Sequence, residues 1–199
     1  MENIFQDHIN EWKKKNKEGR FAEARQFYFD QLFEEVIANF ERQIVNKWHL
    51  EEPDVLFSIL GFTPEPIILA ERALRPNKHV VFYDKEVSFN EENFRFLKQF
   101  LNDENFIQVK FTDDSFGYIY EMMKLQMAFN AGRNYIINIT GGKKSMVASA
   151  SIFARDFNST IIYIDYDEYD SDLRRPTPGT ERMNIVYTPA RDLPEIFHR

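Results

Sequence analysis

The feature that most constrains the fold is a regular alternation of strand-like and helix-like segments that begins after Pro53. Continuous apolar runs are typical of strands buried on both faces, and repeated strand–helix units build parallel sheets. The sequence therefore predicts an α/β fold, with a doubly wound, mostly parallel sheet of about six strands. The expected strands lie at 54–60, 79–83, 106–111, 135–139, 160–165 and 184–188.

Residues 1–50 follow a different pattern. From Phe21 to Trp48 apolar side chains recur at helical spacing, and Gly19 separates this helix from a shorter, lysine-rich one. We therefore expect two domains, an N-terminal helical extension over 1–50 and a sheet domain over 51–199. The run Lys13–Lys15 is interpreted as a solvated helix face, with a membrane-proximal or nucleic-acid role as the alternative.

The composition excludes several classes of protein. The chain has no cysteine, which excludes a disulfide scaffold, a thiolate zinc site and a cysteine nucleophile. Its four histidines are too dispersed to predict a metal cluster, and its net charge of −7 argues against a duplex-DNA binder. The acidic residues at 165–172 are interpreted as a solvated loop rather than a divalent-cation site. We expect neither a cofactor nor a bound metal. We also expect a cytoplasmic protein, since no targeting or membrane-spanning segment is apparent.

Two loops are predicted to meet at one edge of the sheet. In doubly wound sheets, ligands bind beyond the carboxyl ends of the strands, where the strand order reverses. In the common strand order 3-2-1-4-5, the first and fourth strands are neighbours at that point. The loops 61–66 and 140–145, which follow these two strands, are therefore the candidate binding site.

The loop at 140–145 has the composition of a phosphate-binding loop. Gly141 and Gly142 let the backbone approach a ligand closely, and the loop leads directly into a helix N-terminus, which favours anions. Lys143 and Lys144 add positive charge where the helix dipole disfavours it, which indicates an anionic ligand rather than a stabilising role. The spacing differs from a Walker A motif, and no G-x-G-x-x-G is present, so neither an NTPase nor a dinucleotide enzyme is expected.

The loop at 61–66 offers complementary groups. Gly61 allows a sharp exit from the strand, Phe62 could stack on a base, and Thr63 could hydrogen-bond a ribose or a phosphate. Glu65 is interpreted first as a first-turn carboxylate stabilised by the helix dipole, with a ligand contact as the alternative.

Three stretches together resemble one known family: Leu56–Ala70, Leu74–Pro76 and Asn138–Met146. Over about residues 53–188 the chain looks like a CRISPR-associated Rossmann fold (CARF) domain. The resemblance implies a Rossmann-like sheet in a homodimer, with higher oligomers left open. Such a dimer binds a cyclic oligoadenylate, the ring-shaped second messenger of type III CRISPR antiviral defence, across its two-fold axis. The ligand-binding residues implied are Gly61, Phe62, Thr63, Glu65, Asn138, Thr140, Gly141, Gly142, Lys143 and Lys144.

The resemblance leaves alternatives for the activity. We expect a sensor without catalytic residues that binds cyclic tetra-adenylate and relays binding to an effector, such as an N-terminal membrane segment absent from this sequence. The alternative is a ring nuclease that cleaves the messenger without metal, with Thr63, Lys143 or Lys144 stabilising the developing charge. A small-molecule enzyme on the same type of sheet is a third possibility, because a fold does not fix a function.

Overall fold

The computed structural model describes residues 2–47, 52–85, 90–101 and 104–192. The chain divides into two compact units. One comprises Met1–His49 with Asp165–Arg182, and the other comprises Leu50–Ile164 with Met183–Arg199. Compactness does not show that a unit folds on its own, so the two-domain division at residue 50 stays a prediction. No helix among the described residues is long and apolar enough to cross a membrane.

The first unit is mostly helical. Helix α1 spans Glu2–Lys17, and a second helical stretch consists of α2 (Phe21–Phe27), η1 (Tyr28–Leu32) and α3 (Phe33–Lys47). The predicted helix from Phe21 is thus confirmed over its described part, although η1 is a π-helical turn that apolar spacing does not predict. Its aromatic rings form the centre of this unit, with Phe29 and Phe33 5.1 Å apart between ring centroids.

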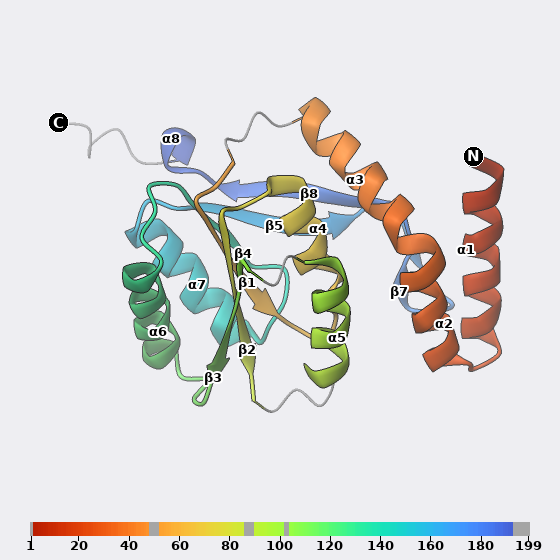
Figure 1. Cartoon of the computed structure of the whole chain (residues 1–199), viewed down its shortest axis with the longest axis horizontal. Helices are drawn as coiled ribbons and strands as arrows, with labels where there is room; N and C mark the ends of the chain where they lie inside the picture. Colours follow the sequence, from red (N-terminus) through yellow and green to blue (C-terminus); the bar gives the residue numbers. More distant parts are fainter. Residues whose placement is uncertain (1, 48–51, 86–89, 102–103, 193–199) are drawn as a thin grey trace. The chain divides into compact units, whose positions relative to one another are not determined.

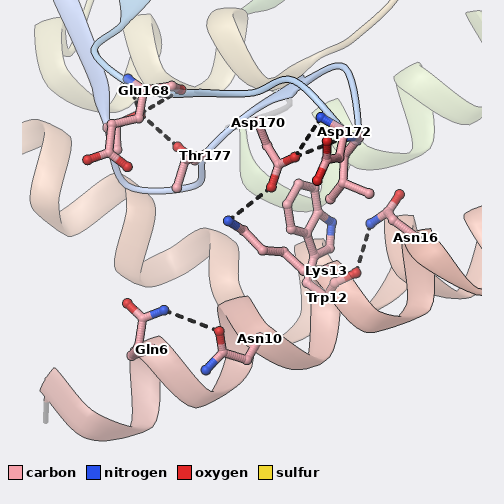
Figure 2. A network of polar contacts seen from close by, with 11 residues as sticks. Gln6, Asn10, Trp12, Lys13, Asn16, Glu168, Asp170, Asp172 and Thr177 are labelled. Carbon is pink, nitrogen blue, oxygen red and sulfur yellow. Dashed lines mark hydrogen bonds and ion pairs between the residues drawn. The ribbon is translucent and has the colours of Figure 1, made fainter.

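A short hairpin belongs to the same unit and contacts α1. It pairs β6 (Tyr169–Asp170) with β7 (Arg175–Pro176). Asp170 Oδ1 accepts the backbone N–H groups of Leu173 and Asp172 at 3.0 and 3.1 Å, and Asp170 Oδ2 lies 3.0 Å from Lys13 Nζ (Figure 2). These bonds, that of Leu173 first, lower the pKa of Asp170. The interpretation of the acidic loop and Lys13 as solvated was therefore wrong at this contact.

The second unit is the predicted doubly wound sheet. Its strands are β1 (Val55–Leu60), β2 (Lys78–Asp84), β3 (Phe106–Phe111), β4 (Tyr135–Asn138), β5 (Thr160–Tyr166) and β8 (Glu181–Tyr187). Its helices are α4 (Glu65–Leu74), α5 (Asn90–Phe100), α6 (Phe116–Phe129), α7 (Lys144–Asp156) and α8 (Pro189–Asp192). The order β3-β2-β1-β4-β5-β8 confirms the expected topology, and the pairs among the first five strands are all parallel.

The layers of this unit follow from that order. Helices α4 and α5 cover one face of the sheet, and α6 and α7 cover the other (Figure 1). Strand β8 runs opposite to β5, so the sheet is mixed but mostly parallel (Figure 1). Right-handed crossovers from β1 and β4 go in opposite directions along the sheet, which places the reversal of strand order between them.

The core fixes β1 at the centre of the sheet. Every residue of β1 is buried, and the Phe57 ring contacts the rings of Phe82, Tyr135 and Phe153 at centroid distances of 5.2, 5.9 and 6.2 Å. Aromatic pairs at such distances add to the burial of apolar surface. The parallel pairing of β1 with β4 places the carboxyl ends of these two strands side by side.

Candidate ligand-binding edge of the sheet

The two candidate loops lie in direct backbone contact. Strands β1 and β4 are paired in parallel with Ser58 opposite Asn138, so both loops leave the same edge of the sheet. A Cβ atom added to Gly61 would lie 2.8 Å from Gly142 N, and one added to Gly141 would lie 2.7 Å from Gly61 N. Any side chain larger than hydrogen would therefore force the loops apart. The predicted meeting of the two loops is confirmed.

Asn138 and Thr140 hold the loops together. The Asn138 side chain is 1% exposed. Its Nδ2 donates to Pro66 O at 3.2 Å, and its Oδ1 accepts from Thr140 N at 3.1 Å and Thr140 Oγ1 at 2.6 Å. The Thr140 hydroxyl in turn accepts the Ile164 N–H at 2.8 Å. These side chains use their polar atoms on the protein, so a direct ligand contact from either one stays a prediction.

The N-terminus of α7 is open to an anion. Gly142 adopts φ +94°, a conformation that glycine reaches easily and that turns the chain into the helix. No side chain caps α7, and the N–H groups of Lys144, Ser145 and Met146 find no acceptor among the described residues. These N–H groups and the helix dipole together give this end of α7 a positive potential.

Several expected ligand residues face solvent. Phe62 is 76% exposed, while its carbonyl accepts a hydrogen bond from Asn93 Nδ2 at 3.3 Å, so the backbone is fixed and the ring stays accessible. Thr63 and Lys144 are exposed, and Glu65 is half-buried in the first turn of α4. An exposed aromatic ring beside an anion-binding backbone suits a ligand that carries both a base and a phosphate.

Lys143 has partners that the sequence analysis missed. Its Nζ lies 2.6 Å from Asp84 Oδ2 and 3.1 Å from Asp114 Oδ2. The hydrogen bond to Asp84, followed by that to Asp114, raises the pKa of Lys143. Asp84 ends β2 and Asp114 follows β3, so both lie at the ligand edge. The strand-end rule that identified the two loops could also have found these carboxylates.

A buried polar cluster lies within the sheet rather than at its edge. His79 Nε2 is 2.8 Å from Ser58 Oγ, and His79 Nδ1 is 2.7 Å from Glu71 Oε2. The sequence of groups is that of a nucleophile, a base and an acid, but Ser58 is 0% exposed and His79 is 1% exposed. A substrate cannot reach this serine, so the cluster ties β1, β2 and α4 together.

The fold and the edge together define a Rossmann-like domain whose candidate ligand-binding loops lie at the reversal of strand order. A family model described as the Card1 CARF domain matches residues 68–188. Because the match covers more than half of the chain, the chain belongs to this family of CRISPR-associated Rossmann fold domains. The matched range includes the loop after β4 but begins after the loop at 61–66.

Known proteins with similar sequence or fold agree with this assignment. The CRISPR system endoribonuclease Csm6 of Thermus thermophilus is 27% identical over 144 residues, which cover 69% of this chain and 30% of that protein. The chain thus spans less than a third of the curated relative that it matches.

Two solved structures have a similar fold. Enterococcus italicus Csm6 bound to cyclic hexa-2'-fluoro-hexa-dAMP aligns with a TM-score of 0.52 and 12% identity, over 70% of this chain and 43% of that chain. Can2 from Sulfobacillus thermosulfidooxidans in complex with cyclic tetra-adenylate aligns with a TM-score of 0.47 and 21% identity, over 57% and 33%. At 12% identity, the similarity to Enterococcus italicus Csm6 shows the fold alone.

Proposed function

We propose that this chain is a sensor that binds a cyclic oligoadenylate, with cyclic tetra-adenylate as the first candidate. It would act in the cytoplasm of a cell that has type III CRISPR antiviral defence. The observation that carries the proposal is the contact of the loops 61–66 and 140–145 beside the uncapped N-terminus of α7. Family membership and a Csm6 structure that holds a cyclic hexanucleotide support it.

The geometry suits the repeating unit of such a ring. The N–H groups at the start of α7 would bind a phosphate, the Phe62 ring would stack on an adenine, and Thr63 would hydrogen-bond a ribose. We propose that two copies of the chain bind one ring across a two-fold axis, because an isologous dimer presents each loop twice to a symmetric ligand. Binding would then be relayed to an effector outside this sequence.

Titration calorimetry tests the proposal with cyclic tetra-adenylate, cyclic hexa-adenylate and linear tetra-adenylate. We expect one ring per two chains, weaker binding of the linear form, and a dimer by light scattering at micromolar concentration. Lys144→Ala should weaken binding, whereas Lys78→Ala, an exposed lysine at the amino-terminal end of β2, should not. Failure of both rings to bind would contradict the sensor function.

The same samples separate a sensor from a ring nuclease. Cleavage needs a proton acceptor near the attacking 2′-hydroxyl. His79, the histidine of the described sheet, is buried against Ser58 and Glu71, and the edge carboxylates of Asp84 and Asp114 are bound to Lys143. We therefore expect labelled ring incubated with excess protein to stay intact. A linear product that disappears with Lys144→Ala would instead favour the metal-independent ring nuclease.

A further inference from the structure

Lys143 is bound by two carboxylates that come from different strands. Its Nζ contacts Asp84 at the end of β2 at 2.6 Å, and Asp114 in the segment after β3 at 3.1 Å. The two acids differ in their surroundings, since the side chain of Asp84 is 7% exposed and that of Asp114 is 60% exposed. The glycine loop that precedes α7 is therefore attached to both neighbouring strand ends through one ammonium group.

The burial of Asp84 decides whether Lys143 is available to a ligand. A carboxylate removed from water is strongly destabilising when it loses the opposite charge beside it, whereas an exposed ion pair contributes little. A phosphate at the open edge of the sheet would have to draw Lys143 away from Asp84 and leave that carboxylate buried beside it. The more favourable arrangement keeps Lys143 on Asp84 and binds the phosphate elsewhere.

The charges at the edge lead to the same assignment. Lys143 with its two carboxylates carries a net charge of about −1 when all three groups are ionised, which does not attract a phosphate. The Lys144 side chain is exposed, and it forms no hydrogen bond or ion pair with the residues that the structure describes. The positive charges available to an anion here are therefore Lys144 and the first-turn N–H groups of α7.

We propose that Lys143 is a positioning residue that clamps the glycine loop to Asp84 and Asp114, and that Lys144 is the side chain that neutralises a ligand phosphate. The proposal divides two adjacent lysines of one motif into different roles. Its ligand part rests on the proposed function, whereas its structural part does not. Because Asp114 is exposed and negatively charged beside the proposed anion site, it weakens ligand binding by electrostatic repulsion.

The structural part is tested without ligand. Lys143→Ala should lower the melting temperature and speed amide exchange at Gly141 and Gly142, because the loop loses its attachment to β2. Lys144→Ala and the control Lys78→Ala should leave both quantities unchanged. If Lys143→Ala changes neither, the clamp is overturned, whether or not any ring binds.

The ligand part is tested by the salt dependence of ring binding. Lys144→Ala should reduce the slope of log affinity against log salt by about 0.7 for each phosphate that the protein no longer neutralises. The charge-free pair Asp84→Asn with Lys143→Gln keeps a hydrogen bond and should keep the wild-type slope. Asp114→Asn should tighten binding by about twofold to fivefold, the range expected for one exposed charge interaction.

The outcomes are distinct. A slope that falls equally in Lys144→Ala and in the charge-free pair would show that Lys143 also contacts phosphate, and would overturn the division of roles. If no ring binds to the wild-type protein, the proposed function fails, while the melting and exchange measurements still decide the clamp.

Discussion

Replacement of Asn138 should destabilise the sheet domain more than its size suggests. Asn138→Ala removes hydrogen bonds to Pro66 O, Thr140 N and Thr140 Oγ1 and leaves these groups without that partner. Each of these hydrogen bonds contributes about 1 kcal/mol to the free energy of unfolding. The buried groups that lose their partner together cost about 1 to 3 kcal/mol more. We therefore expect a loss of about 4 to 6 kcal/mol in the free energy of unfolding, which corresponds to about 8 to 24 °C in melting temperature for a protein of this size.

Urea denaturation followed by circular dichroism measures this loss directly, since an unchanged m-value shows that the unfolding reaction is the same. Thr140→Val is the matched variant, because it removes the hydroxyl that donates to Asn138 Oδ1 and accepts from Ile164 N. It should cost about 1 to 3 kcal/mol. The double variant should lose less than the sum, because the two residues share a bond.

Asn138→Asp tests whether the site tolerates a charge. The carboxylate still accepts from Thr140, but it cannot donate to Pro66 O and is buried without an opposite charge, so at neutral pH its loss of stability should be at least that of Asn138→Ala. The reasoning is refuted if Asn138→Ala unfolds within about 1 kcal/mol of wild type, or if the double variant is strictly additive.

Two further predictions concern backbone geometry and pH. Gly142→Ala should abolish ring binding and destabilise the protein, because φ is +94° and a Cβ would collide with the side chain of Ile59. Gly117→Ala in α6 is the control, since its Cβ would meet no atom of the described residues, and it should be neutral or stabilising in thermal melts. The N–H groups of Arg133 and Asn134 lower the pKa of Asp54 from its ordinary 3.8. The contribution of ionised Asp54 to the free energy of unfolding is therefore complete above its ordinary pKa and is lost as the pH falls through its lowered pKa. In thermal melts across pH, the stability deficit of Asp54→Asn relative to wild type should therefore shrink below about pH 4.

Local sequence patterns predicted most of the sheet. Apolar runs such as the one around Phe57 are long enough for strands and too short for buried helices. The observed strand order is the common one for doubly wound sheets, which the sequence analysis assumed. The glycines after β1 and β4 were recognisable because close backbone contact excludes every other residue. Family resemblance then suggested the proposed ligand, which the periodicity of the sequence does not indicate.

Other features depended on residues far apart in the chain. The partners of Lys143 lie on two other strands, and those of Lys13 lie on a hairpin near the other end of the sequence. Local composition made both lysines look alike, as solvated or ligand-binding cations. Only the fold brings each lysine to its carboxylate. The cost of leaving a buried carboxylate without an opposite charge then keeps the ammonium group in place. The sequence by itself thus determined where the candidate binding edge lies, and the tertiary structure decided which of its charges are already paired.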